Sequence, residues 1–131
     1  MNCMHVTRMF GPDDRERQFV AQPTWEVVER AIRSLNGLDR TFVSLSNERP
    51  DSHMGIGGGS GYFICYVTDD NLNFNNLIDP SNGLEMCSLV TGGQRGEFQA
   101  RQCVTLEAVL DAASAYYKTG RRDESLVWEP Q

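Results

Sequence analysis

The chain has 131 residues, of which 40% are hydrophobic, and its 18 acidic against 12 basic residues give a formal net charge of -6. This composition predicts one globular domain over residues 1–131, with no need of disulfides or metals to hold its core. The excess of acids disfavours nucleic acid and anionic membranes as partners, and the sequence contains neither a membrane-spanning run nor a secretory signal, so we expect a cytoplasmic protein.

The first part of the chain is expected to hold a strand, a turn and a helix. Weak alternation of apolar residues predicts a strand over residues 3–10, and the composition of 11–15 predicts a turn. A helix is predicted over 24–36, where apolar residues recur every three or four positions. Thr24 can cap its N-terminus, and Gly37 can cap its C-terminus in the left-handed conformation.

The middle of the chain changes to the two-residue period of β-strands. Strands are predicted over 41–45, 53–57, 61–67 and 84–90. The pair Gly92-Gly93 is typical of a tight hairpin turn, and we expect the return strand over 97–104. Strands that follow one another through short turns form antiparallel sheets.

A second helix is predicted over residues 105–119, between Thr105 as N-cap and Gly120 as C-cap. Residues 126–128 are expected to return as a short edge strand or to dock on the core. The predicted fold class is therefore α+β: a curved antiparallel sheet of about four to six strands with two helices packed on one face.

Residues 55–61, Gly-Ile-Gly-Gly-Gly-Ser-Gly, contain enough glycine to cradle a phosphate. Phosphate-binding loops, however, open onto a helix whose N-terminal amides bind the anion. This run opens onto the predicted strand 61–67, so we interpret the glycines as a hairpin or bulge with close backbone packing. A small regulatory or ligand-binding module that uses residues 55–61 is the alternative function.

The sequence offers few groups of residues whose spacing is typical of a catalytic site. The two histidines, His5 and His53, have no zinc-type spacing with other ligands, and no nucleophile elbow occurs. The four cysteines are expected to be reduced; they are Cys3, Cys65, Cys87 and Cys103. We therefore predict no catalytic, metal or cofactor-binding residue and no enzymatic activity. A cysteine-dependent enzyme remains a third possibility, and it would require a thiol of low pKa.

The charges are distributed unevenly along the chain. Residues 50–94 contain five acids and neither Lys nor Arg. A surface with charge of one sign attracts partners of the opposite sign. This segment therefore favours a cationic partner.

An ordered set of motifs extends over residues 20–129. It comprises Trp25 on the first helix, Gly57-Gly58 before an aromatic strand, Leu77-Ile78-Asp79-Pro80, Gly92-Gly93-Gln94-Arg95-Gly96-Glu97-Phe98, the predicted helix after Val104, and Ser125-Leu126-Val127-Trp128-Glu129. In order and spacing this set resembles a family of bacterial polymorphic-toxin immunity proteins, the first numbered class, often encoded beside nucleic-acid deaminase-type toxins. The resemblance implies an inactive α+β protein that neutralises a cognate toxin by stoichiometric occlusion of its active site.

The expected partner is thus a toxin with a basic substrate surface. Nucleic acid, membranes and small molecules are not expected as partners of this chain. The acids of the segment could supply charge, and its asparagines can both donate and accept hydrogen bonds. An arginine at a hairpin tip and a tryptophan near the C-terminus are further contact candidates. The predicted toxin-binding residues are Asp69, Asp70, Asn71, Asn73, Asn75, Asn76, Asp79, Arg95 and Trp128.

Overall fold

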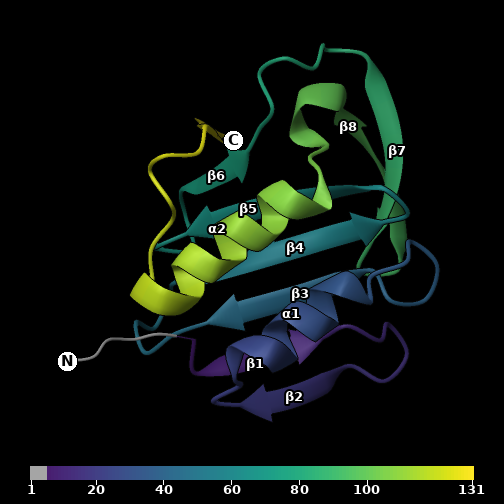
Figure 1. Cartoon of the computed structure of the whole chain (residues 1–131). Helices are drawn as coiled ribbons and strands as arrows, with labels where there is room; N and C mark the ends of the chain where they lie inside the picture. The colour runs from purple at the N-terminus through teal and green to yellow at the C-terminus, as the bar shows by residue number, and fades with distance from the viewer. Residues whose placement is uncertain (1–5) are drawn as a thin grey trace.

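The computed structural model describes residues 6–131, which form an antiparallel sheet with two α-helices on one face (Figure 1). The seven strands of this main sheet follow the order β2-β1-β3-β4-β5-β6-β9, and β7 and β8 form a separate hairpin. The elements are β1 (Arg8–Gly11), β2 (Gln18–Ala21), α1 (Trp25–Arg33), β3 (Phe42–Ser46), β4 (His53–Gly59), β5 (Tyr62–Thr68), β6 (Phe74–Leu77), β7 (Met86–Thr91), β8 (Gln94–Gln99), the 3-10 helix η1 (Ala100–Gln102), α2 (Leu106–Thr119) and β9 (Trp128–Pro130). The predicted α+β class, with helices on one face, is confirmed.

The hydrophobic core lies between the helices and the sheet. Alternate residues of the central strands point toward the helices, among them Ile56 of β4, which is fully buried. Ile32 of α1 and Val109 of α2 cover them and are also fully buried. Within residues 6–131, no helix is long and apolar enough to cross a membrane.

Local capping explains where the helices begin and end. The Thr24 hydroxyl accepts a hydrogen bond from the Val27 amide at 3.3 Å, and α2 begins with the equivalent threonine cap and ends at Gly120 with φ +74°. Helix α1 ends at Arg33, earlier than predicted. The Asn36 side-chain oxygen accepts three successive backbone amides of the following loop, which competes with continuation of the helix. Gly37 keeps its left-handed φ of +74° but lies in this loop.

Some of the strand predictions were wrong in detail. The main sheet has seven strands rather than four to six, because β2 and β6 were not anticipated. Strand β1 begins at Arg8, and the predicted strand start at residues 3–5 lies outside the described residues. The return strand predicted over 97–104 ends at Gln99, after which η1 turns the chain toward α2. The Gly92-Gly93 turn is confirmed, with φ values of +63° and +81°.

The glycine run is a packing feature. Tyr66 fills the space beside Gly55, the Thr91 side chain fills that beside Gly57, and the backbone of Asn36 and its neighbour closes on Gly59. These contacts leave no room for a ligand at the three glycines. The interpretation as close packing is therefore confirmed, although only part of the run has positive φ, and Gly57 owes its identity to contact alone.

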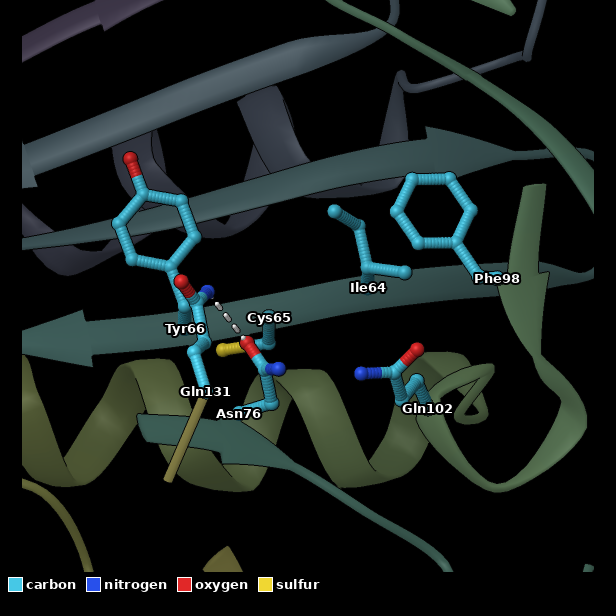
Figure 2. Close-up of a pocket in the computed structure, with 7 residues that line it drawn as sticks. All are labelled: Ile64, Cys65, Tyr66, Asn76, Phe98, Gln102 and Gln131. Atoms are coloured by element: carbon cyan, nitrogen blue, oxygen red, sulfur yellow. Dashed lines mark hydrogen bonds between the residues drawn. The ribbon is translucent and has the colours of Figure 1, made fainter. Parts of the chain in front are cut away.

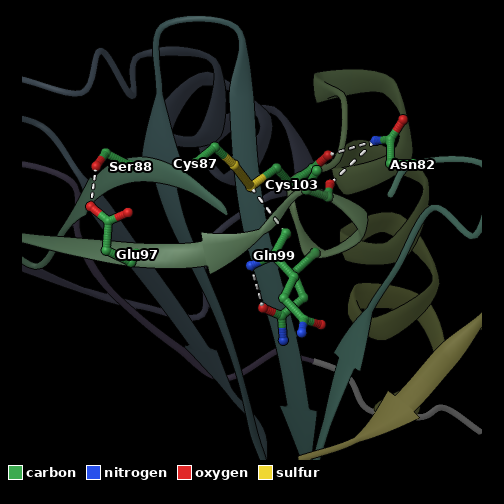
Figure 3. The surroundings of a disulfide bond; sticks show 8 residues. Asn82, Cys87, Ser88, Glu97, Gln99 and Cys103 are labelled. Carbon is green, nitrogen blue, oxygen red and sulfur yellow. Dashed lines mark hydrogen bonds between the residues drawn. A yellow bond between two sulfur atoms is a disulfide. The ribbon is translucent and has the colours of Figure 1, made fainter. Parts of the chain in front are cut away.

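Hairpin β7–β8 crosses one end of the sheet (Figure 1) and is linked by a disulfide to the residue that follows η1 (Figure 3). Cys87 and Cys103 form this bond, so the expectation that these two cysteines are reduced was wrong, and Cys3 lies outside the described residues. The two residues are 16 positions apart in sequence, but the return of β8 alongside β7 brings the second back beside the first. Cys65 is free and buried.

Candidate partner-binding site

The loop between β5 and β6 is organised around Asp70. Its carboxylate accepts hydrogen bonds from the backbone amides of Leu72 at 2.9 Å and Asn73 at 2.7 Å, from the Asn73 side chain, and from the Thr68 hydroxyl. These bonds favour the charged form and lower the pKa of Asp70 from 3.8 to about 2. The Asp70 carboxylate therefore stabilises the conformation of the loop, and its oxygens are occupied by hydrogen bonds within the loop.

Replacing Asp70 by alanine is expected to destabilise the protein at neutral pH but not in strong acid. The folded-state pKa lies below the unfolded value, so the contribution of Asp70 is complete above about pH 4 and is lost as the pH falls through about 2. Urea unfolding of both proteins at several pH values should show the two stabilities converging toward pH 2. A difference that stays constant down to pH 2 would contradict this role of the carboxylate.

Asp69, the neighbouring acid, is exposed as well. Its side chain is 60% accessible and forms an ion pair with Arg49 at 3.2 Å. A second arginine, Arg122, lines a small cavity of about 110 Å³ beside the same loop. Residues 50–94 contain no basic residue, but in the folded protein Arg49 and Arg122 lie beside this loop. The surface around the loop is therefore not purely acidic.

The other predicted residues are dispersed. Asp79 accepts hydrogen bonds from the backbone and hydroxyl of Ser81 and shapes a turn, which also lowers its pKa. Arg95 lies on β8 and is exposed. Trp128 packs against the core and its indole donates to the Asp123 carbonyl at 2.8 Å, so this ring docks the end of the chain.

The asparagines are divided between a loop and a strand. Asn71 lies in the loop, with an unusual φ of +60°, and Asn73 belongs to the hydrogen bonds around Asp70. Asn75 and Asn76 are part of β6, which was predicted as loop, because pairing with β5 and β9 on both sides outweighs the low strand propensity of asparagine. Adjacent strand residues point to opposite faces, so only Asn76 faces away from the helices.

The face of the main sheet that no described helix covers is rich in aromatic side chains. Register places six large apolar residues on it: Phe10, Phe19, Phe42, Ile64, Tyr66 and Phe74. We call this set the aromatic face. Phe10 and Phe19 are 40% and 53% exposed, with ring centroids 5.0 Å apart. Large exposed apolar patches mark sites of interaction more often than isolated apolar residues do.

A histidine adds a polar group to the aromatic face. The Nε2 atom of His53 and the Tyr66 hydroxyl form a hydrogen bond of 3.2 Å, in which either group can be the donor. Its ring stands edge-on to both Tyr66 and Phe74, with centroids 5.4 and 6.1 Å away. Partial burial lowers the pKa of His53, which favours the uncharged ring.

A pocket of about 300 Å³ opens at the edge of the aromatic face (Figure 2). It lies beside Ile64 and Cys65 of β5, on the side away from β4, where β6 pairs only with Tyr66–Thr68 and Val104 bridges to Phe63. Its lining is uncharged and consists of Ile64, Cys65, Tyr66, Asn76, Phe98, Gln102 and Gln131. Apolar walls with a few convergent polar groups are typical of binding sites.

The amide groups of the pocket have defined orientations. The Gln102 side-chain oxygen accepts a hydrogen bond from the backbone amide of Gln99 at 3.2 Å. The Asn76 side-chain oxygen accepts one from the side-chain NH₂ group of Gln131 at 2.9 Å. The NH₂ groups of Asn76 and Gln102 are therefore available as donors. Figure 2 shows these two side chains pointing toward each other from opposite sides of the pocket.

The cysteine that lines the pocket is unsuited to nucleophilic chemistry. Burial raises the pKa of the Cys65 thiol from 9.0 to about 12, which keeps it protonated at neutral pH. A catalytic thiol needs the opposite shift. Among residues 6–131, no group of three or more His, Cys, Asp or Glu side chains is placed to hold a metal ion.

Residues 16–130 match the family model described as Immunity protein Imm1. The chain belongs to the Imm1 family of immunity proteins. This match covers both helices, the whole aromatic face except β1, and the pocket up to residue 130. It confirms the resemblance indicated by the ordered motifs of residues 20–129. No curated protein matches the chain.

Of the nine predicted contact residues, only Asn76 lies in the pocket. The aromatic face and the remaining pocket residues were missed. Strand β5 carried the relevant signal, because its residues are apolar at both odd and even positions. An antiparallel strand with one solvent-exposed face usually alternates between apolar and polar residues, so this departure indicates a second apolar surface.

Proposed function

We propose that this Imm1-family protein binds a cognate bacterial toxin and neutralises it by stoichiometric occlusion of the toxin's active site. The observation that carries the proposal is the family match over residues 16–130. An immunity protein requires a toxin partner, and binding over the active site is the simplest way in which a protein without catalysis can inhibit. We further propose that the toxin belongs to a polymorphic system and acts on nucleic acid, as a deaminase does.

The charge of the chain supports this class of toxin. An enzyme that acts on nucleic acid needs a basic surface for the phosphates. A protein with a net charge of -6 complements such a surface and is captured faster by it. The exposed acids and asparagines of the predicted contact set, Asp69 and Asn71 above all, would then lie at the rim of the interface.

The proposal is tested with the toxin domain encoded next to this chain's gene. Cells that express the active toxin should survive only when this protein is also expressed. The purified pair should form an equimolar complex in which the toxin no longer modifies its nucleic acid. Failure of the wild-type chain to protect cells or to bind would contradict the proposed function.

Replacing Asp69 by asparagine is expected to slow association with the toxin by roughly two- to fivefold, while the dissociation rate changes little, because exposed charges mainly steer the encounter. Raised salt should reduce the wild-type rate in the same way. The control is Asp111→Asn, which removes one exposed acid from α2 on the helical side. An association rate unaffected by both Asp69→Asn and salt would exclude steering by this loop. Asp70 is kept intact because it holds the loop.

A further inference from the structure

We propose that the toxin docks on the aromatic face, and that the pocket beside it receives an uncharged carbonyl group from a loop of the toxin. This inference rests on the proposed function and specifies where its interface lies. It moves the centre of the interface from the acidic loop to the face of the sheet opposite the helices.

The aromatic face has the size and composition of an interface core. It extends from Phe19 on β2 to Phe74 on β6, six neighbouring strands that span roughly 24 Å at about 4.8 Å per strand. The strands give it a length of roughly 20 Å at about 3.4 Å per residue. Thr91 of hairpin β7–β8 packs on this face beside Gly57, so the open part is smaller than the full rectangle and supplies at most about half of the roughly 800 Å² that each partner contributes to a stable complex. Aromatic residues are enriched and charges depleted at the centre of such interfaces.

The distribution of charge also favours this face over the acidic loop. The strands β4, β5 and β6 carry neither Lys, Arg, Asp nor Glu, so the centre of the face is uncharged. In the acidic loop, by contrast, Asp69 is paired with Arg49 and Asp70 is bound internally. Desolvation on binding costs less for the neutral face than for paired charges. The loop then serves as a polar rim.

The chemistry of the pocket defines what it can hold. Two NH₂ donors, from Asn76 and Gln102, converge on it from opposite sides (Figure 2). They match an acceptor oxygen. A carboxylate would be buried there without a cation, because no lining residue is charged. A main-chain carbonyl or the side-chain carbonyl of Asn or Gln has no such penalty, and Ile64 and Phe98 accommodate the apolar atoms that accompany it.

Two substitutions test the proposal with the toxin domain encoded next to this chain's gene, made catalytically inactive for purification. Asn76→Leu preserves size and removes one donor, and we expect it to raise the Kd about tenfold. Its control is Asn75→Leu on the same strand, which faces the helices. Phe10→Glu places a charge on the aromatic face and should raise the Kd at least tenfold. Its control is Leu38→Glu in the loop before β3, where the leucine is 81% exposed.

Calorimetry gives the Kd, and thermal melting verifies that each variant is folded. Losses confined to Asn76→Leu and Phe10→Glu, in folded proteins, would support the proposal. If the wild type binds and the Kd is unchanged in both variants, the proposed location of the interface is wrong, whereas the proposed function is unaffected. Absence of wild-type binding would overturn both. Sedimentation that shows a wild-type dimer, made monomeric by Phe10→Glu with toxin affinity unchanged, would instead assign the face to a second copy of this chain.

Discussion

Replacing Gly58 by valine is expected to lower the free energy of unfolding by roughly 2–5 kcal/mol. Gly58 has a φ of +101°, which a β-branched residue adopts only with strain. A Cβ at this position would also lie 2.8 Å from the Tyr62 carbonyl oxygen and 3.2 Å from the Phe63 Cα, both backbone atoms that cannot move independently. Chemical denaturation monitored by circular dichroism measures the loss.

Two neighbouring glycines separate the causes of this loss. Gly61 has a φ of +105°, but no atom lies within 4 Å of the position that a Cβ would occupy, so Gly61→Val tests backbone strain alone. Gly57 has no left-handed φ but touches Thr91, so Gly57→Val tests crowding alone. We expect each to cost less than Gly58→Val. If Gly58→Val retained full stability and instead abolished binding of a small molecule, the alternative function as a ligand-binding module would be favoured.

Truncating Tyr116 to alanine is expected to cost roughly 3–5 kcal/mol, the range for large aromatic side chains in cores. Tyr116 is fully buried in α2. Its hydroxyl lies 2.8 Å from the Ser52 hydroxyl and 3.2 Å from the Asn47 amide, which also donates to the Gly120 carbonyl. This network joins the turn between β3 and β4 to the end of α2. Removal of the ring leaves a cavity, and the buried Asn47 and Ser52 side chains each lose one hydrogen bond.

Tyr116→Phe separates the hydrogen bonds from the ring, and it should cost roughly 1–3 kcal/mol because Asn47 and Ser52 stay buried. The matched control is Tyr117→Phe, which removes a single bond of 2.8 Å to the Pro23 carbonyl at a less buried position and should cost less. Urea unfolding at neutral pH provides both values. Equal stability of Tyr116→Phe and the wild type would mean that the buried network contributes nothing.

The fold and the contact residues differ in how far the sequence predicts them. The helices, the central strands and the hairpin turn depend on neighbours within a few residues. Thr105 caps α2 through an amide three positions away, and Gly92-Gly93 supplies the positive φ of its own turn. A partner-binding surface depends instead on which distant segments meet. Asp69 and Asp70 are adjacent in sequence, yet one is paired with Arg49, 20 residues away, and the other binds its own loop.

The sequence by itself therefore determined the α+β class, the capped ends of α2, the strands β3 to β5 and membership of the Imm1 family, because local periodicity and ordered motifs carry that information. Only the tertiary structure decided that asparagines form β6, that Thr91 requires a glycine at Gly57, and that Cys87 meets Cys103. It likewise assembled the aromatic face, whose members come from five strands. Each of these depends on contacts between residues far apart in the chain, and such contacts leave no periodic trace in the sequence.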